Sequence, residues 1–446
     1  MSEHTTTLTP LTGERYLESL LTPSPTQAVS ALTRFGVLRQ AAATTARTLA
    51  MPTTRDEEWR FTDLSLLSKT VFAPALSATP LDIDAITPFQ IDEVRTRLVF
   101  VDGIYAPQLS SPVSESGIVI STLSAAVVTH ATLIDAHLGR HAAFDQDIFA
   151  ARNTAALQEA AVVIVPRDVA LDAPIQLLFI ATQKEVVSTP RCLVIAETGS
   201  VVTVIEDYVV LYQPRWQEEA HFTNAVTEIA LADNARVNHI RVQREGTHAF
   251  HIAQCAVSLG RASHYQSVSI ALGGRISRTN LNVVHTADGA TCTLDGLTLI
   301  AGRQLADTHT CIDHAKPYGT SRQLHKCIVG DSAHAVFNGK VIVREGAQRT
   351  DAQQSNRNLL LTRKARIDTK PQLEIFASDV KCTHGATVGQ LDAEEVFYLQ
   401  SRGLTEAAAR SLLTYAFGAE VIGRIGVASL RRQLERVLLE QTTRPL

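Results

Sequence analysis

A long central series of short apolar runs, with no helix between them, limits what this chain can fold into. Over residues 162–380 apolar and polar positions alternate with a period close to two, as in VVTVI at 201–205. Turns of small residues separate the runs, for example TGS at 198–200 and DGA at 288–290. Because no crossover helices connect these predicted strands, a doubly wound α/β fold is excluded.

The turns also favour one all-β architecture over the others. A sandwich or a propeller favours frequent two-residue hairpin turns, and only Asn338-Gly339 and Asp288-Gly289 resemble one. In a parallel β-helix each coil stacks on the next, so that only the two ends expose strand edges. The sequence therefore predicts a mainly β protein, a parallel β-helix with helical regions at both ends.

Three regions follow from this pattern. We predict an N-terminal helical region with a linker over 1–95, and a β-helix core over 96–380 with regular coils from about residue 160. The remaining part, 381–446, is predicted to be a C-terminal helical region. Residues 30–50 have helical spacing of Ala, Leu, Arg and Thr, which supports the assignment of the first region.

The predicted C-terminal helices carry clear start and stop signals. Asp392 is a good N-cap, and Glu395 three residues later completes a capping box. Gly403 ends that helix, and Thr405 caps the next one. A third amphipathic helix is predicted near 428–439. Such a small helical appendage on a solenoid indicates a cap or a docking surface rather than a catalytic domain.

Composition excludes several classes of function. The net charge is −4 with acids and bases interspersed, which gives no electrostatic reason to expect nucleic acid or an anionic membrane as a partner. No apolar run approaches the roughly 18 residues that span a bilayer, and the polar N-terminus lacks the order of a signal peptide. The 6 cysteines are scattered without a CxxC motif, which suits a reducing compartment. We therefore predict a cytosolic protein.

Cys382 and His384 form the first candidate metal site. Thiolate and imidazole both bind iron, zinc and copper, and residues two apart in a strand point to the same side. Two ligands are too few for a closed site, so further ligands would have to come from elsewhere, including from another chain. The alternative is a buried cysteine beside a hydrogen-bonded histidine at a turn.

A second group of ligand-type residues precedes this pair: His309, Cys311, His314, His325, Cys327 and His334. Strand alternation would place His309 and Cys311 on one face, with His314 beyond a turn. The spacing matches no zinc motif. We therefore favour a structural or interface role for this group, although the sequence does not decide which of its side chains face the interior.

The usual signatures of catalysis are missing from the sequence. It contains no G-x-S-x-G elbow and no GxxxxGK[ST] loop, so we expect no nucleotide to be bound by this chain and no enzymatic activity. A β-helix carbohydrate lyase or hydrolase is the main rival interpretation. It would need converging carboxylates and exposed aromatic side chains, whereas aromatic residues make up 5% of the chain.

Several motifs are specific enough to suggest a family. Near the N-terminus EWRFTD occupies 58–63. The later motifs are VFNGK at 336–340, AQRTDA at 347–352, NRNLLL at 356–361, PQLEI at 371–375, DVKCTHGAT at 379–387 and FYLQSRG at 397–403. With these motifs the chain resembles the SufB/SufD family, the scaffold subunits of the SUF iron–sulfur cluster assembly system, and in particular its SufD branch.

The resemblance implies both an architecture and partners. It implies a right-handed parallel β-helix between helical N- and C-terminal regions, in a complex with the paralogue SufB and with SufC, an ABC-type ATPase. The missing P-loop agrees with an ATPase supplied by another chain, and the C-terminal helices resemble the surface that docks SufC. Whether a homodimer also forms is left open.

The resemblance also implies site residues. The functional histidine of the Cys-x-His-Gly motif, at the interface with SufB, corresponds to His384, and Cys382 is the weaker candidate. SufB has a cluster-holding cysteine in the strand that corresponds to 356–358, and a His-Glu pair where this chain has His384-Gly385. This chain lacks that thiolate, which implies a partner of the main scaffold rather than a stand-alone one.

Partner contacts are expected from five further residues: Asn356, Asn358, Phe397, Tyr398 and Arg402. We expect a nascent iron–sulfur cluster, or iron, to lie transiently between His384 and SufB. The function expected from the resemblance is thus iron–sulfur cluster assembly and delivery, without catalysis by this chain. A purely structural adaptor without metal contact is the remaining alternative.

Overall fold

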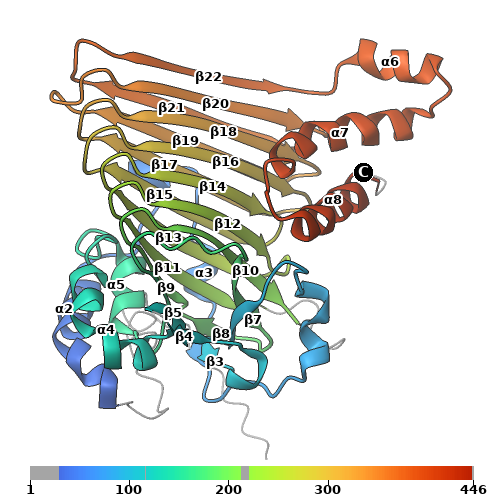
Figure 1. Cartoon of the computed structure of the whole chain (residues 1–446). Coiled ribbons are helices and arrows are strands. Elements are labelled where there is room, and N and C mark those ends of the chain that lie inside the picture. Colours follow the sequence, from blue (N-terminus) through green and yellow to red (C-terminus); the bar gives the residue numbers. More distant parts are fainter. Residues whose placement is uncertain (1–29, 116, 212–219, 444–446) are drawn as a thin grey trace, which may run out of the picture.

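The chain folds into a flattened β-solenoid with helices at both ends (Figure 1). The computed structural model describes residues 30–115, 117–211 and 220–443. Two sheets face each other. From β9 to β22 successive strands alternate between the two sheets, and each strand pairs in parallel with the next strand of its own sheet. The predicted parallel β-helix between helical regions is confirmed.

Each sheet contains every second strand of the solenoid. In hydrogen-bonding order, sheet A consists of β21 (Arg366–Ile375), β19 (His334–Val343), β17 (Leu305–His314), β15 (Ile276–His285), β13 (Phe250–Leu259), β11 (Phe222–Leu231), β9 (Arg191–Ala196), β6 (Ala161–Val165), β5 (Ile118–Thr122) and β4 (Val113–Glu115), with β8 (Val186–Ser188) beside β11 and β1 (Ala73–Pro74) beside β8. Sheet B consists of β22 (Lys381–Gly389), β20 (Asp351–Leu360), β18 (Thr320–Val329), β16 (Thr291–Ile300), β14 (His264–Ala271), β12 (Arg236–Arg244), β10 (Val201–Val210), β7 (Ile175–Ala181), β2 (Thr96–Val101) and β3 (Ile104–Tyr105).

The predicted turns form corners of the solenoid, and the reason is conformational. Gly199, Asn234, Gly289 and Asp331 all adopt positive φ angles, between 49° and 71°. Glycine, asparagine and aspartate tolerate this left-handed backbone better than other residues. The corners therefore fall where these residues occur in the sequence, and the strands between them alternate inward and outward side chains.

Helices and short antiparallel strands cover the first coils, an end of the solenoid that we call the base (Figure 1). Strand β3 pairs antiparallel with β2, and β5 pairs antiparallel with both β4 and β6. Phe35, Leu123 and Ile134 form a core with Val162 and Leu193 of sheet A. The helical segments of this region are η1 (Ser30–Phe35), α2 (Gly36–Thr48), η2 (Glu57–Trp59), α3 (Ser65–Lys69), η3 (Ile83–Phe89), η4 (Pro107–Leu109), α4 (Leu123–His137) and α5 (Ile148–Ala155).

The C-terminal helices are α6 (Ala393–Ser401), α7 (Glu406–Ile422) and α8 (Ala428–Thr443). Residues of α7 and α8 such as Val421, Leu434 and Leu438 join a core with the outer face of sheet B, whereas α6 extends away from the solenoid (Figure 1). The predicted caps are confirmed, since the side chains of Asp392 and Thr405 accept backbone N–H groups at the starts of α6 and α7. No described helix combines the length and apolarity that crossing a membrane requires.

One predicted boundary is wrong. Residues 381–389 were expected in the C-terminal helical region, but they form strand β22, and the helices begin only at Ala393. The reason is that the alternation continues through this segment, so that its backbone pairs with β20 in register, Ala352 with Cys382 and Gln354 with His384. The first candidate metal site therefore lies on the last coil of the solenoid itself.

Candidate functional site

The open end of the solenoid, which we call the rim, consists of β21 and β22. These strands end the two sheets, so each pairs with only one neighbour. The side chains of β21 are mostly half-buried and those of β22 mostly exposed, whereas the strands of the preceding coils are largely buried. Unpaired N–H and C=O groups at such an edge can pair with a strand of another chain. The rim is thus the part of the solenoid that can continue its sheets.

His384 lies in the middle of the rim. Its Cα partner is Gln354 of β20, and paired residues of parallel strands point to the same face of the sheet. The Gln354 side chain points inward, because its Nε2 donates to Gln323 Oε1 at 2.8 Å in the solenoid interior. The imidazole of His384 therefore stands on the inner side of the last strand, where it is exposed rather than sealed in the core.

Cys382 shares this inner side but has a different environment. It is half-buried and packs against an apolar cluster that includes Val341 and Val343. Partial burial raises the pKa of the Cys382 thiol, which disfavours the thiolate form that binds metals. The structure thus supports His384 as the better ligand of the two. Among the described residues, no group of three or more His, Cys, Asp or Glu side chains is arranged to hold a metal ion.

Asn356 and Asn358 do not form the partner-binding surface that was predicted for them. Both side chains are buried. Asn358 Nδ2 donates to Asn356 Oδ1 at 2.5 Å and to the Thr387 carbonyl at 3.0 Å, and Thr369 donates to Asn356 Oδ1 at 2.8 Å. The alternation of β20 points both amides into the solenoid, where they link β20 to the rim strands. The expected direct contact with a partner is therefore corrected to a structural role beneath the rim.

The other predicted partner residues lie on an open surface. Phe397 and Tyr398 on α6 have 71% and 56% of their surface exposed, and the Arg402 guanidinium lies 5.2 Å from the centre of the Tyr398 ring. Next to α6, a hollow of about 680 Å³ lies between α7 and α8. Its lining is mainly apolar: Leu404, Ala407, Ala408, Ser411, Leu412, Tyr415, Glu435, Arg436 and Leu439. We call the hollow together with α6 the docking face.

The second group of histidines and cysteines does not come together, because strand alternation divides it. His314, His325 and Cys327 point inward. His314 Nε2 lies 2.9 Å from Ser321 Oγ of the opposite sheet, and the His325 ring packs 4.8 Å from that of Phe337. Burial lowers the pKa of His314 to about 4 and that of His325 to about 3, and raises that of Cys327 to about 12. These groups are neutral parts of the core. His314 is the last residue of β17 and not, as expected, beyond a turn.

The remaining members face outward on sheet A. His334 Nε2 lies 2.7 Å from Asp368 Oδ2. Burial, and to a lesser extent the charge of Asp313, raises the pKa of Cys311 to about 11, so this thiol is not a ready metal ligand. His309 is held between two carboxylates, with Nδ1 at 3.2 Å from Glu58 Oε2 and Nε2 at 2.9 Å from Asp307 Oδ1. The structural or interface role expected for this group fits these positions.

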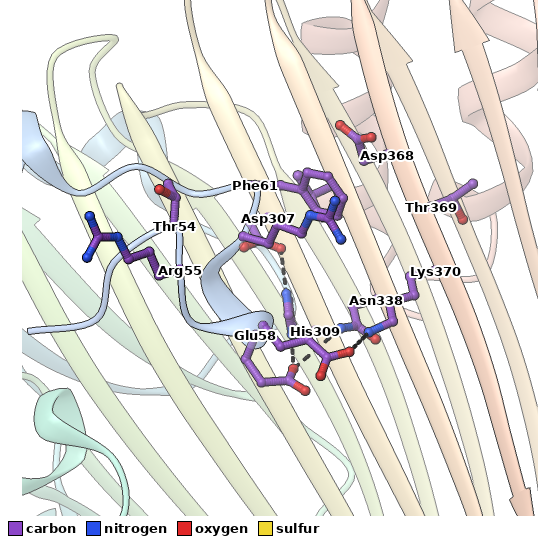
Figure 2. A pocket seen from close by; sticks show the side chains of 13 residues that line it. Thr54, Arg55, Glu58, Phe61, Asp307, His309, Asn338, Asp368, Thr369 and Lys370 are labelled. Carbon is purple, nitrogen blue, oxygen red and sulfur yellow. Dashed lines mark hydrogen bonds and ion pairs between the residues drawn. The ribbon is translucent and has the colours of Figure 1, made fainter.

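His309 belongs to a pocket that the sequence did not reveal (Figure 2). Residues 53–63, which we call the strap, lie against the outer face of sheet A and enclose a cavity of about 440 Å³. Burial opposes protonation of His309, but Asp307 and Glu58 outweigh it and raise its pKa. Burial would also raise the pKa of Asp307, yet Arg278 and His309 lower it to about 2. The strap is thus attached through an imidazole held between two carboxylates, whose charges favour its protonated form.

Other side chains of the strap strengthen this attachment. Trp59 lies 5.5 Å from Phe149 between ring centres, and the Arg278 guanidinium stacks 3.7 Å from the Trp59 ring. Thr62 donates to Asp307 Oδ2 at 2.5 Å, and Glu57 pairs with Lys370 of β21. The family-like motif at 58–63 was the signal that could have shown that this segment is bound.

Comparisons with known proteins agree with the fold and with the motifs. Residues 179–417 match the family model described as the SUF system FeS cluster assembly, SufBD core domain, and residues 26–177 match the SufBD protein N-terminal region. An iron–sulfur cluster assembly SufBD family protein of Synechocystis is 42% identical over 405 residues, which are 89% of each chain. The iron–sulfur cluster assembly protein SufD of Escherichia coli is 36% identical over 390 residues, 86% of this chain and 88% of the relative. SufD of Bacillus subtilis is 26% identical over 411 residues, 90% of this chain and 92% of the relative.

The two family models together follow the division seen in the structure. The N-terminal model covers the base with its helices, and the core model covers the solenoid from β7 into α7. The motifs that suggested the resemblance fall at the strap, in the last coils of the solenoid from β19 to β22, and on α6. This chain belongs to the SufBD family of the SUF iron–sulfur cluster assembly system.

Proposed function

We propose that this chain is the SufD-type scaffold subunit of a SUF complex, joined at its rim to a SufB-type paralogue and at its docking face to a SufC-type ATPase. The observation that carries the proposal is an exposed imidazole, His384, on the inner side of a last strand that has one free edge. Relatives named SufD support the system in which the chain works. The subunit contacts and the metal contact are our inference from geometry and chemistry.

The rim suits a rod-to-rod junction. Both sheets end there with a free edge, which a strand from a second solenoid can extend by main-chain hydrogen bonds. Large apolar side chains next to that edge, Ile375, Phe376 and Val388, are exposed. Their burial by a second subunit would add apolar stabilisation to the main-chain pairing. A paralogue with the same solenoid section would match this end, and a second copy of this chain is the homodimeric version of the same contact.

The chemistry of a seam between two subunits fits cluster assembly. A neutral imidazole binds iron through a ring nitrogen, and His384 offers it on the side that faces the interior of the joined solenoids. His384 and Cys382 alone are too few for a complete coordination shell, so the paralogue would supply the other ligands. The nascent iron–sulfur cluster is the cargo of such a site and leaves it after assembly.

The docking face offers a way to couple the seam to ATP hydrolysis. The sequence has no P-loop, so the nucleotide would be bound by another subunit. Helix α6 follows β22 after residues 390–392 alone. A movement imposed on the C-terminal helices by a closing ATPase would therefore reach the strand that carries His384 through a very short connection. In this way the ligands of two chains could approach or separate during a cycle.

The test is to replace His384 with Ala in a strain that co-produces the paralogue and the ATPase. We expect the complex to form normally while cluster formation, measured by visible absorption and iron content after anaerobic purification, falls about tenfold or more. Thr383→Ala is the matched control, because Thr383 is also exposed on β22 but points to the other face of the sheet. Normal cluster formation in the His384→Ala complex would refute the metal contact.

The same experiment addresses the alternatives left open by the sequence. A purely structural adaptor predicts unchanged cluster formation with the His384→Ala complex intact. Membership of the SufBD family favours a scaffold over a carbohydrate-active enzyme, and a polysaccharide cleavage assay would test that rival. Co-purification of an ABC-type ATPase and a second β-helix protein with this chain would test the proposed partners. The cytosolic location stays a prediction.

A further inference from the structure

A directed series of hydrogen bonds runs through the solenoid interior toward the rim. Gln323 Nε2 of β18 donates to Thr310 Oγ1 of the opposite sheet at 2.6 Å. One coil further, Gln354 Nε2 of β20 donates to Gln323 Oε1 at 2.8 Å. Each rung thus donates to the one before it and leaves its own carbonyl oxygen for the next. We call this series the amide ladder.

The ladder ends on an acceptor without a donor. Gln354 is only 2% exposed, and its Oε1 is buried with no hydrogen-bond partner in the structure. A buried acceptor of this kind is unusual in a native protein, where such groups nearly always find a donor. The next residue in register, on the coil that follows, is His384. Its ring nitrogens make no hydrogen bond to any described residue, so the terminal acceptor and a free donor are neighbours.

We infer that Gln354 is a positioning residue for His384: its Oε1 accepts the N–H of one imidazole nitrogen and leaves the other nitrogen deprotonated toward the seam. The part of this inference that concerns metal binding rests on the proposed function. The hydrogen bond itself does not. The two side chains are not bonded in the structure, and the inferred bond forms when the exposed ring turns toward Oε1. His384 then supplies a third donor, which continues the direction of the two preceding hydrogen bonds.

The packing around Gln354 explains why its amide keeps this orientation. Gly339 of β19 lies opposite, and a Cβ there would come within 2.3 Å of Gln354 Nε2. The missing side chain leaves space in the interior for the amide, which bonds Gln323, its partner in register on the neighbouring strand β18. With Nε2 held by Gln323, Oε1 is the atom left to receive a donor from the rim. The amide is thus fixed before any metal or partner arrives.

Such a hydrogen bond has a defined chemical consequence. A histidine that binds a metal commonly donates its second ring N–H to a carbonyl or carboxylate, which fixes both the tautomer and the direction of the ring. An amide oxygen does this without adding charge beside the seam. His384 would therefore present a lone pair in one direction, rather than an imidazole that turns freely at an exposed strand.

The experiment observes the hydrogen bond directly, without a cluster assay. We would label the full-length chain with ¹⁵N-histidine and record the ring N–H proton of His384 at a pH where imidazole is neutral, with His384→Ala identifying the signal. In the unchanged protein we expect a resonance protected from exchange with water. Gln354→Met removes the acceptor at similar size, and we expect the protected resonance to disappear.

Asn358→Leu is the matched control. Asn358 lies on the same strand and inner face, is 4% exposed, and also has an unpartnered side-chain oxygen, but it pairs in register with Val388 rather than with a histidine. We expect the His384 resonance to persist in this variant. Persistence of the resonance in Gln354→Met, or its loss in both variants alike, would overturn the inference.

The outcome is separable from that of the proposed function. If Gln354→Met abolishes the resonance while the His384→Ala complex still forms clusters normally, the positioning contact stands and the metal role of His384 falls. If His384→Ala abolishes cluster formation while Gln354→Met leaves the resonance unchanged, the metal role stands and the inference falls. Where both hold, we expect cluster formation to fall in Gln354→Met as well, by less than in His384→Ala.

Discussion

The base and the rim of the solenoid end the same two sheets in opposite ways. At the base the final strands turn antiparallel, as β3 does beside β2 and β5 beside β6, and helices cover them. At the rim β21 and β22 remain parallel, uncovered and open on one side. Since an uncovered edge invites pairing with other chains, a protein that protects one end and leaves the other open has a directed site of association. The asymmetry supports the proposal that a partner joins the chain at the rim.

The largest effect is expected at the covered side near the base. Arg191 and Glu228 form an ion pair of 2.5 Å with neither side chain exposed, and Glu228 also accepts backbone N–H groups from Gly139, His141 and Ala142. Glu228→Gln leaves the Arg191 charge buried without a counter-charge. We expect the free energy of unfolding to fall by about 3–5 kcal/mol, measured by urea denaturation with circular dichroism.

The control for that substitution is an ion pair in water. Asp233 pairs with Arg261 at 3.1 Å on the surface, and both side chains are largely exposed. Asp233→Asn should change the free energy of unfolding by no more than about 1 kcal/mol. Equal losses in the free energy of unfolding in the two variants would show that the buried ion pair stabilises the fold no more than the surface pair does.

A second comparison sets a glycine of the interior against one of the rim. A Cβ at Gly296 would lie 2.3 Å from the His325 ring nitrogen Nδ1, whereas a Cβ at Gly385 would meet nothing within 4 Å. We expect Gly296→Ala to cost about 1–3 kcal/mol of stability through overpacking, and Gly385→Ala to change it by no more than about 0.5 kcal/mol. Thermal unfolding of both variants would measure this. A large loss in Gly385→Ala would mean that the rim is packed as tightly as the interior.

A third comparison concerns binding at the two ends. Phe397 on α6 is 71% exposed, and Val128 on α4 near the base is 77% exposed. If the docking face holds the ATPase, Phe397→Ser should weaken that association roughly 10- to 100-fold, as loss of an aromatic anchor does, and Val128→Ser should leave it unchanged. Isothermal titration calorimetry with the ATPase would measure the affinity of each variant. Equal affinities for both variants and the unchanged chain would contradict the docking face.

The smallest effect is expected from pH, at the strap. His309 has a folded-state pKa raised above its ordinary value of 6.5, with Glu58, Asp307 and Arg278 as the charged groups around it. Its ion pairs therefore stabilise the strap fully below pH 6.5, and this contribution is lost as the pH rises through the raised folded value. Trp59 fluorescence in a Trp216→Phe background should report gradual release of the strap as the pH rises through this raised pKa.

His309→Gln is the variant that checks this assignment. It can still hydrogen-bond but cannot carry a charge, so the fluorescence of Trp59 should become independent of pH over the same range. A pH dependence that survives in His309→Gln would place its origin in another group. Trp216 lies outside the described residues, and its replacement serves only to leave Trp59 as the single reporter.

Most of the architecture could be predicted from the sequence because it depends on local rules. The strand period, the corner residues with left-handed backbone and the caps at Asp392 and Thr405 are properties of short segments. The boundary at 381 was missed because a change toward helical signals begins soon after β22. A single strand of nine residues between a turn and a cap has too little sequence to prove its own period.

In the candidate site too, local motifs could be recognised from the sequence, whereas side-chain burial and long-range contacts could not. His384 was identified through its motif, and the structure places it exposed on the last coil, while its contact with a partner stays a prediction. Asn356 and Asn358 were assigned to a surface although alternation buries them, since the inner face of a strand cannot be distinguished from the outer one by polarity when both carry amides. The pairing of His309 with Glu58 joins segments far apart in the chain, and only the folded structure brings them together.

The open rim has a consequence for how assembly can be followed. Strand β22 is held by hydrogen bonds on one side only, and most of its side chains are exposed to water. Its amide hydrogens should therefore exchange with deuterium sooner than those of the coils beneath it. When a partner strand covers that edge, the same amides become slow. The deuterium uptake of a peptide spanning 381–389, measured by mass spectrometry, would then report whether a partner covers the rim, without any label attached to the protein.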